Sequence, residues 1–167
     1  MKKKLVITVI LMLTAFLPVR SQTAQTLPDI ALESASGASV RSKSLLKEEK
    51  PLIITFWGTW CKPCIKEIDA LCDLLVEYPD HDKIKVVAIC VDDSRSSAKA
   101  RAFAAGRGWD EVTILYDPRA EFQHSLNVNV VPYSFVFTSD GHLEYSHSGY
   151  TPGSESELMA KVSELLK

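Results

Sequence analysis

The chain has 167 residues, of which 46% are hydrophobic and 24% charged, and this is enough for one domain with a sizeable core. Its formal net charge is −2 and it contains no block of basic residues, so a nucleic-acid partner is not expected. Four cysteines are too few for a disulfide-stapled scaffold at this length.

Residues 1–21 have the pattern of a secretion signal. Lysines at positions 2–4 precede an uncharged apolar stretch at 5–17, which is shorter than the roughly 20 residues that a membrane-spanning helix needs. The segment ending at Ser21 offers acceptable residues for cleavage. We therefore predict a signal peptide over 1–21, with an uncleaved membrane tether as the alternative.

A polar, flexible leader is expected at 22–26, followed by one domain over 27–167. Apolar and β-branched runs between turn signals predict the strands, and helical spacing of apolar residues predicts the helices. The predicted strands are 27–32, 40–41, 51–57, 84–91, 112–115, 133–138 and 142–147. The predicted helices are 44–50, 65–78, 94–108, 119–126 and a last one that starts at Ser154, with Glu157 completing a capping box.

The sequence Trp60-Cys61-Lys62-Pro63-Cys64 lies where the buried strand 51–57 gives way to a helix. The first turn of a helix has unpaired N–H groups and the positive end of the helix dipole, and both stabilise a thiolate. Cysteines in such positions have their thiol pKa lowered from about 8.5 to roughly 3.5–7.5. Pro63 suits this first turn, where a missing N–H costs nothing. The pair is therefore a candidate redox-active disulfide.

The helix register predicts different surroundings for the two sulfurs. Cys64 begins the apolar face of the helix and is expected to point inward, whereas Cys61 at its tip is expected to be exposed. Disulfide exchange needs this difference, because an accessible thiolate attacks and a shielded thiol resolves the mixed disulfide. Glu67 lies one turn from Cys64 and could accept its proton, but a solvated helix-flank position is the alternative.

Other interpretations of the cysteine pair find less support. A zinc site would need a second pair of ligands, and haem attachment would need histidine where Ile65 stands. A purely structural disulfide stays open, although such short loops are readily reduced. The four histidines show no ligand spacing, so neither a metal nor a cofactor is expected. Cys72 and Cys90 are expected to fill the core, with a second disulfide between them as the alternative.

The run Phe56-Trp-Gly-Thr-Trp-Cys-Lys-Pro-Cys64 resembles the active site of thioredoxin-fold proteins, and the longer pattern resembles the TlpA/ResA-type thiol-disulfide oxidoreductases. The resemblance extends from about Leu27 to the C-terminus. It implies an α/β thioredoxin-like fold, with a central mixed β-sheet flanked by helices, an N-terminal β-hairpin and an inserted helix and strand at about 94–115.

The resemblance also implies a substrate-binding surface around the cysteines. Pro132 precedes a buried strand and is similar to the cis-proline of the family, which would leave the backbone of Val131 free to pair with an extended substrate. Trp60, Lys62 and Pro63 flank or separate the cysteines and are expected to contact substrate at this surface.

At one position the sequence departs from ordinary thioredoxin. Thr55 stands in the strand where thioredoxins have a buried acid that serves the inner cysteine as a base. Glu67 would take that role, as its counterpart is thought to do in ResA-like members.

The resemblance implies a bacterial periplasmic or cell-envelope enzyme that acts on protein disulfides or thiols and depends on a membrane or envelope redox partner. Reduction of protein disulfides, as in apocytochrome c maturation, is the favoured direction. A disulfide-introducing oxidase or isomerase and a non-catalytic binding module are the alternatives. A peroxiredoxin is disfavoured, because its motif would need Pro at Ile54 and Thr at Gly58.

Overall fold

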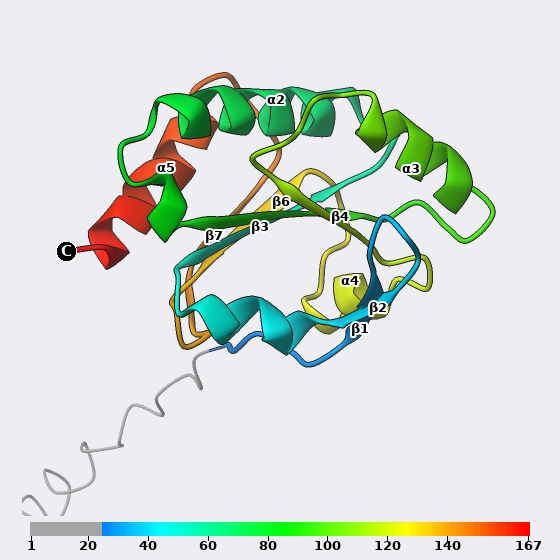
Figure 1. The fold of residues 1–167 in the computed structure, drawn as a ribbon, viewed down its shortest axis with the longest axis horizontal. Helices are drawn as coiled ribbons and strands as arrows, with labels where there is room; N and C mark the ends of the chain where they lie inside the picture. The colour runs from blue at the N-terminus through cyan, green and yellow to red at the C-terminus, as the bar shows by residue number, and fades with distance from the viewer. Residues whose placement is uncertain (1–24) are drawn as a thin grey trace, which may run out of the picture.

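The computed structural model describes residues 25–167, which form one seven-stranded mixed sheet with helices on both faces (Figure 1). The strand order is β2-β1-β5-β4-β3-β6-β7. β3, β4 and β5 run parallel to one another, whereas β1, β2, β6 and β7 are joined to their neighbours by antiparallel pairing. The strands are β1 (Ala31–Glu33), β2 (Ser39–Arg41), β3 (Leu52–Trp57), β4 (Lys85–Cys90), β5 (Thr113–Tyr116), β6 (Tyr133–Phe137) and β7 (Leu143–Ser148). The predicted fold class is confirmed.

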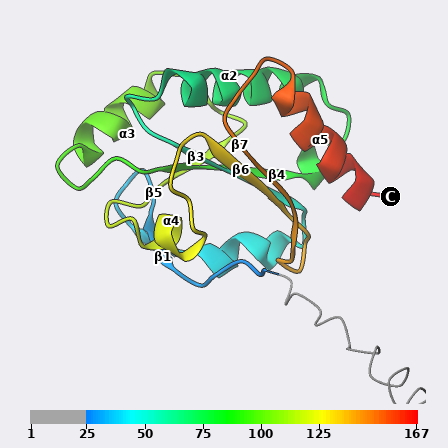
Figure 2. The same cartoon turned by 180° about the vertical axis from the view of Figure 1, so that it is seen from behind.

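Helices cover the sheet unequally. The three longer ones, α2, α3 and α5, lie on one face, and the short α4 and the 3-10 helix η1 lie on the other (Figures 1 and 2). The helical segments are η1 (Ser42–Glu48), α2 (Lys62–Glu77), η2 (His81–Lys83), α3 (Ser97–Ala105), α4 (Glu121–Ser125) and α5 (Ser154–Leu165). Within residues 25–167, no helix has the length and apolar character needed to cross a membrane.

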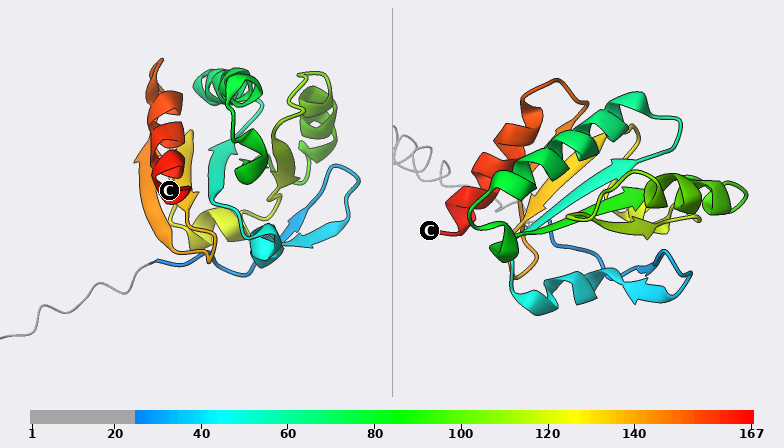
Figure 3. Two further views of the ribbon diagram at one scale, coloured as in Figure 1. Left: turned by 60° about the vertical axis from the view of Figure 1, so that its left-hand side comes forward. Right: turned by 45° about the horizontal axis from the view of Figure 1, so that its top comes forward.

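Alternation along β3 divides the core into two clusters. Ile53 and Trp57 pack with α2 and α5, whereas Leu52, Ile54 and Phe56 face α4 and η1. Every residue of β3 is buried, as expected for a strand covered on both faces. The end-on view in Figure 3 shows α2 above the middle of the sheet, over the strands that carry the candidate site.

Several boundaries differ from those predicted. The strand predicted over 27–32 is shorter and lies later in the chain, as β1 (Ala31–Glu33). Residues before β1 are not paired as a strand, because the Leu27 N–H donates to the Gly141 carbonyl and the Ile30 N–H donates to the Ser42 hydroxyl. The predicted signal peptide over 1–21 lies outside the described residues. Of the predicted leader 22–26, only Gln25 and Thr26 are described. The Gln25 carbonyl accepts the N–H of Leu143 at the start of β7, and Thr26 forms an isolated antiparallel bridge with His142.

The ends of two helices also differ. Helix α2 begins at Lys62 rather than at residue 65, so that Cys64 lies inside the first turn. The capping box predicted for the last helix is wrong. Gly153, with φ at 104°, is the N-cap of α5, and the carboxylate of Glu155 rather than that of Glu157 accepts the Gly153 N–H.

Candidate active site

The two cysteines of the motif form a disulfide at the N-terminus of α2. Their sulfurs are 2.01 Å apart and their Cα atoms 5.4 Å apart. Cys61 is the N-cap residue, and its Sγ accepts the N–H of Cys64 at 3.3 Å. The Cys61 sulfur therefore lies against the unpaired N–H groups and the positive end of the helix, which favours a thiolate there once the disulfide is reduced.

The expectation that Cys61 is exposed is wrong for this disulfide-bonded state. Cys61 is 5% exposed, because it packs into the same apolar cluster as Trp57, and Cys64 is 0% exposed. Cys61 is thus the more exposed of the two cysteines, as predicted, but only a small part of its surface is accessible to solvent. Trp60, next to the pair, is 67% exposed, as expected for a residue at a substrate surface.

Asp92 holds the turn that leads into the cysteines. It lies just beyond β4, and its carboxylate accepts the Thr59 N–H at 3.1 Å and the Thr59 hydroxyl at 2.6 Å. A Cβ on Gly58 would come within 2.9 Å of the Asp92 carboxylate and 2.8 Å of the Trp60 ring, so this turn requires glycine. Asp92 was not predicted from the sequence as part of the site. Its position just after β4 could have indicated this role, because β3 and β4 are parallel neighbours and their carboxyl ends lie at the same edge of the sheet.

Glu67 is fully buried, which excludes the alternative of a solvated carboxylate. The Thr55 hydroxyl donates to its Oε2 at 2.8 Å, and the Ser134 hydroxyl donates to its Oε1 at 3.1 Å. Thr55 therefore binds the carboxylate of Glu67 from the position where thioredoxins carry their own acid. Because Cys64 and Glu67 are three residues apart on one helix face, the thiol and the carboxyl group are neighbours.

A third polar side chain reaches Glu67 from β7. His147 places its Nε2 3.3 Å from Oε1 of Glu67, and its side chain is 16% exposed. Thr55 pairs with Ser134 across β3 and β6, and Ser134 pairs with His147 across β6 and β7. We call these three residues the polar row. From the sequence, His147 was weighed only as a metal ligand, and its spacing did not support that role. Its period-two alternation with Tyr145 was a signal that it faces inward, but the strand register that aligns the row was not available.

The predicted substrate contacts lie at the same end of the sheet. The Val131–Pro132 peptide bond is cis, as the resemblance implied. Tyr133 pairs with Phe56, so Pro132 lies at the edge where β3 leads into the cysteine turn. Lys62 and Pro63 are exposed on the first turn of α2.

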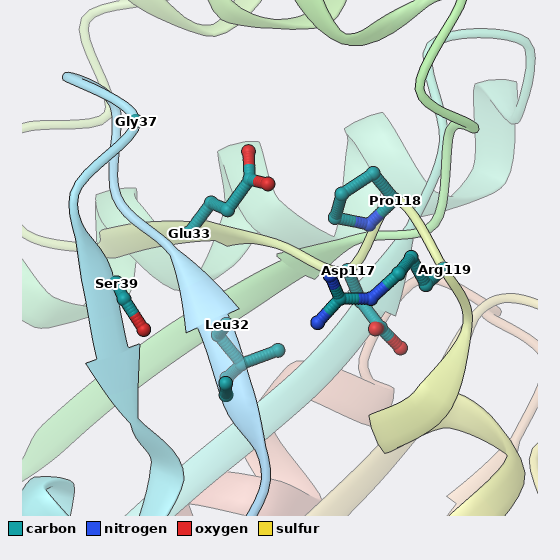
Figure 4. Close-up of a pocket in the computed structure, with 8 residues that line it drawn as sticks. Leu32, Glu33, Gly37, Ser39, Asp117, Pro118 and Arg119 are labelled. Atoms are coloured by element: carbon teal, nitrogen blue, oxygen red, sulfur yellow. The ribbon is translucent and has the colours of Figure 1, made fainter.

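Those two exposed residues also line a shallow hollow of about 180 Å³, together with Lys66, Tyr150 and Pro152. A second hollow, of about 150 Å³, lies between β1, β2 and the segment after β5 (Figure 4). Glu33, Asp117 and Arg119 line it, and none of the cysteine-motif residues does. Residues 25–167 contain no group of three or more His, Cys, Asp or Glu side chains arranged to hold a metal ion.

Cys72 and Cys90 are free thiols, so the alternative of a second disulfide is not realised. Cys90 is buried in β4, and Cys72 packs against the same apolar cluster from α2. Burial raises the pKa of the Cys90 thiol to about 12. Burial, with the negative charge of Asp69 nearby, raises the pKa of Cys72 to about 12 as well. Neither residue is suited to be a nucleophile at neutral pH.

The strand-to-helix cysteine pair, the cis-proline edge and the seven-stranded sheet define a thioredoxin-like protein with a redox-active disulfide. The sequence model of the AhpC/TSA family matches residues 23–146. Similar proteins are named thiol-disulfide oxidoreductase ResA and thiol:disulfide interchange protein DsbE. The chain belongs to the AhpC/TSA family and, within it, to the TlpA/ResA-like thiol-disulfide oxidoreductases.

Three similar sequences illustrate this relationship. The thioredoxin-like protein YneN of Bacillus subtilis is 32% identical over 81% of this chain and 77% of its own length. The thiol:disulfide interchange protein DsbE of Haemophilus influenzae is 28% identical over 89% of this chain and 88% of its own. The thiol-disulfide oxidoreductase ResA of Bacillus thuringiensis is 26% identical over 73% of this chain and 67% of its own.

Solved structures give the same fold. An uncharacterised thioredoxin-like protein from Porphyromonas gingivalis has a TM-score of 0.72 and 34% identity, covering 83% of this chain and 90% of its own. The structure of a DsbE-type protein from Chlorobium tepidum has a TM-score of 0.71 at 22% identity, covering 86% of this chain and 97% of its own, and supports the fold alone.

The raised thiol pKa values predict selective alkylation. After reduction at pH 8, iodoacetamide should modify Cys61 within minutes, whereas Cys72 and Cys90 should stay unmodified until the protein is unfolded. The reason is that a thiol with a pKa of about 12 is almost fully protonated at pH 8, and the thiolate is the reactive form. Mass spectrometry of tryptic peptides measures each site, and urea-unfolded protein is the control. Rapid modification of Cys90 in the folded protein would contradict this prediction.

Proposed function

We propose that the protein is exported to the bacterial cell envelope, where it reduces disulfide bonds of other proteins through Cys61 and Cys64. The observation that carries the proposal is a cysteine pair in disulfide form at a helix N-terminus, with the buried carboxyl group of Glu67 beside it. Thiol-disulfide exchange is the chemistry in the names of the relatives ResA and DsbE.

The reaction proceeds in two exchange steps, starting from the reduced protein. The Cys61 thiolate attacks one sulfur of a substrate disulfide, forming a Cys61–substrate bond and releasing the other substrate sulfur as a thiolate. The Cys64 thiolate then attacks the Cys61 sulfur, closing the Cys61–Cys64 bond and releasing the second substrate thiolate. The substrate gains two electrons and the protein loses them, which returns it to the disulfide state described above.

Glu67 takes the proton that Cys64 loses before the second step. Cys64 has no exposed surface, so water cannot serve as its base directly. Glu67 lies one helical turn away, and hydroxyl groups from Thr55 and Ser134 hold its carboxylate in place. A positioned base of this kind accelerates proton transfer by roughly 10²–10⁴-fold.

Substrate binds across the edge formed by the cysteine turn and the start of β6. Trp60 offers an exposed indole surface, and the hollow beside Lys62 and Pro63 adjoins the first turn of α2. The main chain at Val131, next to Pro132, would pair with an extended substrate segment. The partners are therefore protein thiols or disulfides and an envelope redox protein of the dithiol type that restores the reduced state.

Export is supported by the composition of residues 1–21, which combine a basic start with a short apolar stretch. An oxidase that introduces disulfides uses the same residues in the opposite direction, whereas an isomerase rearranges disulfides without net electron transfer; the reduction potential of the pair separates the reductase from the oxidase.

The exchange proposal predicts turnover that depends on both cysteines. The reduced protein should accelerate insulin reduction by dithiothreitol, and Cys61→Ser should lose that activity because the attacking sulfur is gone. Cys64→Ser should form the first bond and stop there, leaving a mixed disulfide that non-reducing electrophoresis detects. Equal rates for wild type and Cys61→Ser would indicate a binding module. A reduction potential near −270 mV or below supports a reductase, whereas one near about −120 mV would indicate an oxidase.

The role given to Glu67 predicts a defect confined to the second step. Glu67→Gln keeps the shape and the hydrogen-bond acceptor but cannot take the proton, so release of substrate from the mixed disulfide should slow by roughly 10²-fold or more at pH 7. Stopped-flow measurement of that release, beside formation of the mixed disulfide in a Cys64→Ser background, separates the two steps. Glu77→Gln, on an exposed position of the same helix, is the control. Unchanged release would remove Glu67 from the mechanism.

The export proposal predicts a processed protein outside the cytoplasm. When the full chain is expressed in a bacterium, the envelope fraction should contain a form that begins at Gln22, as measured by mass spectrometry. Leu11→Arg together with Leu13→Arg interrupts the apolar stretch and should leave the full chain in the cytoplasm. Unprocessed wild-type chain in the membrane fraction would indicate a tether, and unprocessed chain in the cytoplasm would overturn export.

A further inference from the structure

The hollow beside the cysteine motif combines an apolar lining with two lysines, and we call it the lysine hollow. It has a volume of about 180 Å³, and most of its accessible lining is apolar. Its lining residues come from α2 and from the segment between β7 and α5: Lys62, Pro63, Lys66, Tyr150 and Pro152. Small-molecule sites typically occupy about 300–1,000 Å³, so this hollow has the size for a side chain of a bound polypeptide rather than for a cofactor.

Lys62 and Lys66 bring two cations to this hollow without acidic partners. Both side chains are exposed, and among residues 25–167 neither forms a salt bridge with a carboxylate. They are four residues apart on α2, where like charges repel each other, and the first turn of the helix contains no acidic residue. The pair therefore adds no stability to α2, and its charges are free to attract an anion.

The acidic residues nearest the hollow are bound to other groups. Burial and the charges of Glu155 and Glu67 raise the pKa of Tyr150, so its phenol stays neutral at pH 7. Glu67 is fully buried and accepts hydroxyl donors from two strands. Glu155 accepts the Gly153 N–H at 2.9 Å, at the N-terminus of α5, where the helix dipole favours a negative charge. Neither carboxylate therefore serves as the partner of the two lysines.

We propose that the lysine hollow binds an acidic side chain of the substrate polypeptide, so that the protein prefers disulfides flanked by Asp or Glu; this inference rests on the exchange function proposed above. The methylene groups of that side chain pack against Pro63, Pro152 and the ring of Tyr150. Its carboxylate pairs with Lys62 and Lys66, whose long side chains adjust to it. A single exposed ion pair contributes little in water, so the preference needs both cations and the apolar lining.

The place of the hollow makes this preference act on the attack by Cys61. Lys62 and Pro63 stand between the two cysteines, so one wall of the hollow is part of the motif itself. A substrate whose sulfur reaches Cys61 therefore has its neighbouring residues beside the first turn of α2. Complementary charge mainly accelerates association, and salt screens it. The whole chain has a net charge of −2, so an acidic substrate gains no attraction from the protein overall.

The test uses matched peptides that each contain one cysteine joined by a disulfide to an uncharged thiopyridyl group. The cysteine is flanked by Glu, by Gln or by Lys. The Cys61 thiolate of the reduced full chain attacks the peptide sulfur, forming the Cys61–peptide bond and releasing the coloured thiopyridine, which takes its proton from water. Absorbance gives the rate constant. Each value is divided by that for dithiothreitol with the same peptide, which removes the effect of the flanking charge on the disulfide itself.

We expect the corrected rate for the Glu peptide to exceed that for the Gln peptide by roughly tenfold at low salt. The two rates should become nearly equal at about 1 M salt, where charges are screened within about 3 Å. Lys66→Gln should reduce the preference to roughly threefold. Lys62→Glu combined with Lys66→Glu should reverse the order, so that the Lys peptide reacts fastest. The peptides are compared within each variant, so a change in the reactivity of the Cys61 thiolate cancels.

Lys43→Glu combined with Lys47→Glu is the matched control. These two lysines are also exposed and four residues apart, but they lie on η1, on the opposite face of the sheet from α2 (Figure 1). The control makes the same change in net charge and should keep the Glu peptide fastest by the wild-type factor.

Equal corrected rates for the Glu and Gln peptides with the wild-type protein would overturn the proposal. A preference that survives the double change at Lys62 and Lys66, or that the control variant loses to the same extent, would overturn it as well. If the wild-type protein reacts with none of the peptides faster than Cys61→Ser does, the exchange function itself fails. If it reacts with all of them at equal corrected rates, the exchange function stands and only the preference for acidic substrates fails.

Discussion

The carboxyl group of Glu67 lies beneath the cysteine pair with no exposed surface, and the groups that surround it come from one row of residues across β3, β6 and β7. Removing an ionised group from water costs on the order of several kcal/mol unless polar partners replace the solvent. Thr55 and Ser134 supply hydroxyl donors from two strands, and His147 approaches from the third. An apolar residue at position 67 would fill this space without needing the row. The fold therefore retains a costly buried carboxyl group one helical turn from Cys64, where the proposed mechanism requires a base.

The position of the row follows from two simple periodicities. Side chains alternate across a strand, so Ile53, Thr55 and Trp57 all face α2, and Thr55 is the polar member of that set. Along α2, residues three apart share a face, so the turn that buries Cys64 also buries Glu67. The geometry of α2 therefore buries the Cys64 thiol and the Glu67 carboxyl group together. A shift of one residue in the β3–β6 register would turn Ser134 to the opposite face and remove one donor.

The sequence was sufficient for the parts of the site that depend on local pattern. The cysteine pair at a strand-to-helix junction, the buried strand before it and the place of Glu67 on the helix all follow from spacing within about 20 residues. The inward position of Glu67 was left undecided, because it lies beside the apolar stripe and its burial depends on donors in distant strands. His147 was missed for the same reason, since its partner on α2 is 80 residues away in the chain.

Exposure at Cys61 illustrates a different limit. The prediction that Cys61 is exposed rested on the helix alone, since nothing within a helix covers a residue at its tip. The turn from Gly58 to Trp60, held by the carboxylate of Asp92, packs close to the pair and leaves Cys61 5% exposed. Such packing follows from contacts between the ends of β3 and β4, which no local pattern contains.

Two buried carboxylates thus lie on either side of the cysteine turn, and their partners give them different roles. Asp92 accepts both donors of Thr59, a backbone N–H and a hydroxyl, so its bonds fix the geometry of the main chain. Glu67 is held by hydroxyls that can rotate, and its remaining neighbour is an imidazole with both nitrogens free of hydrogen bonds among the described residues. A group whose partners can reorient tolerates a change of protonation, whereas one bound to a fixed backbone N–H does not. In the proposed exchange reaction, Asp92 would therefore fix the turn that carries Cys61, and Glu67 would be the carboxylate able to exchange a proton with Cys64.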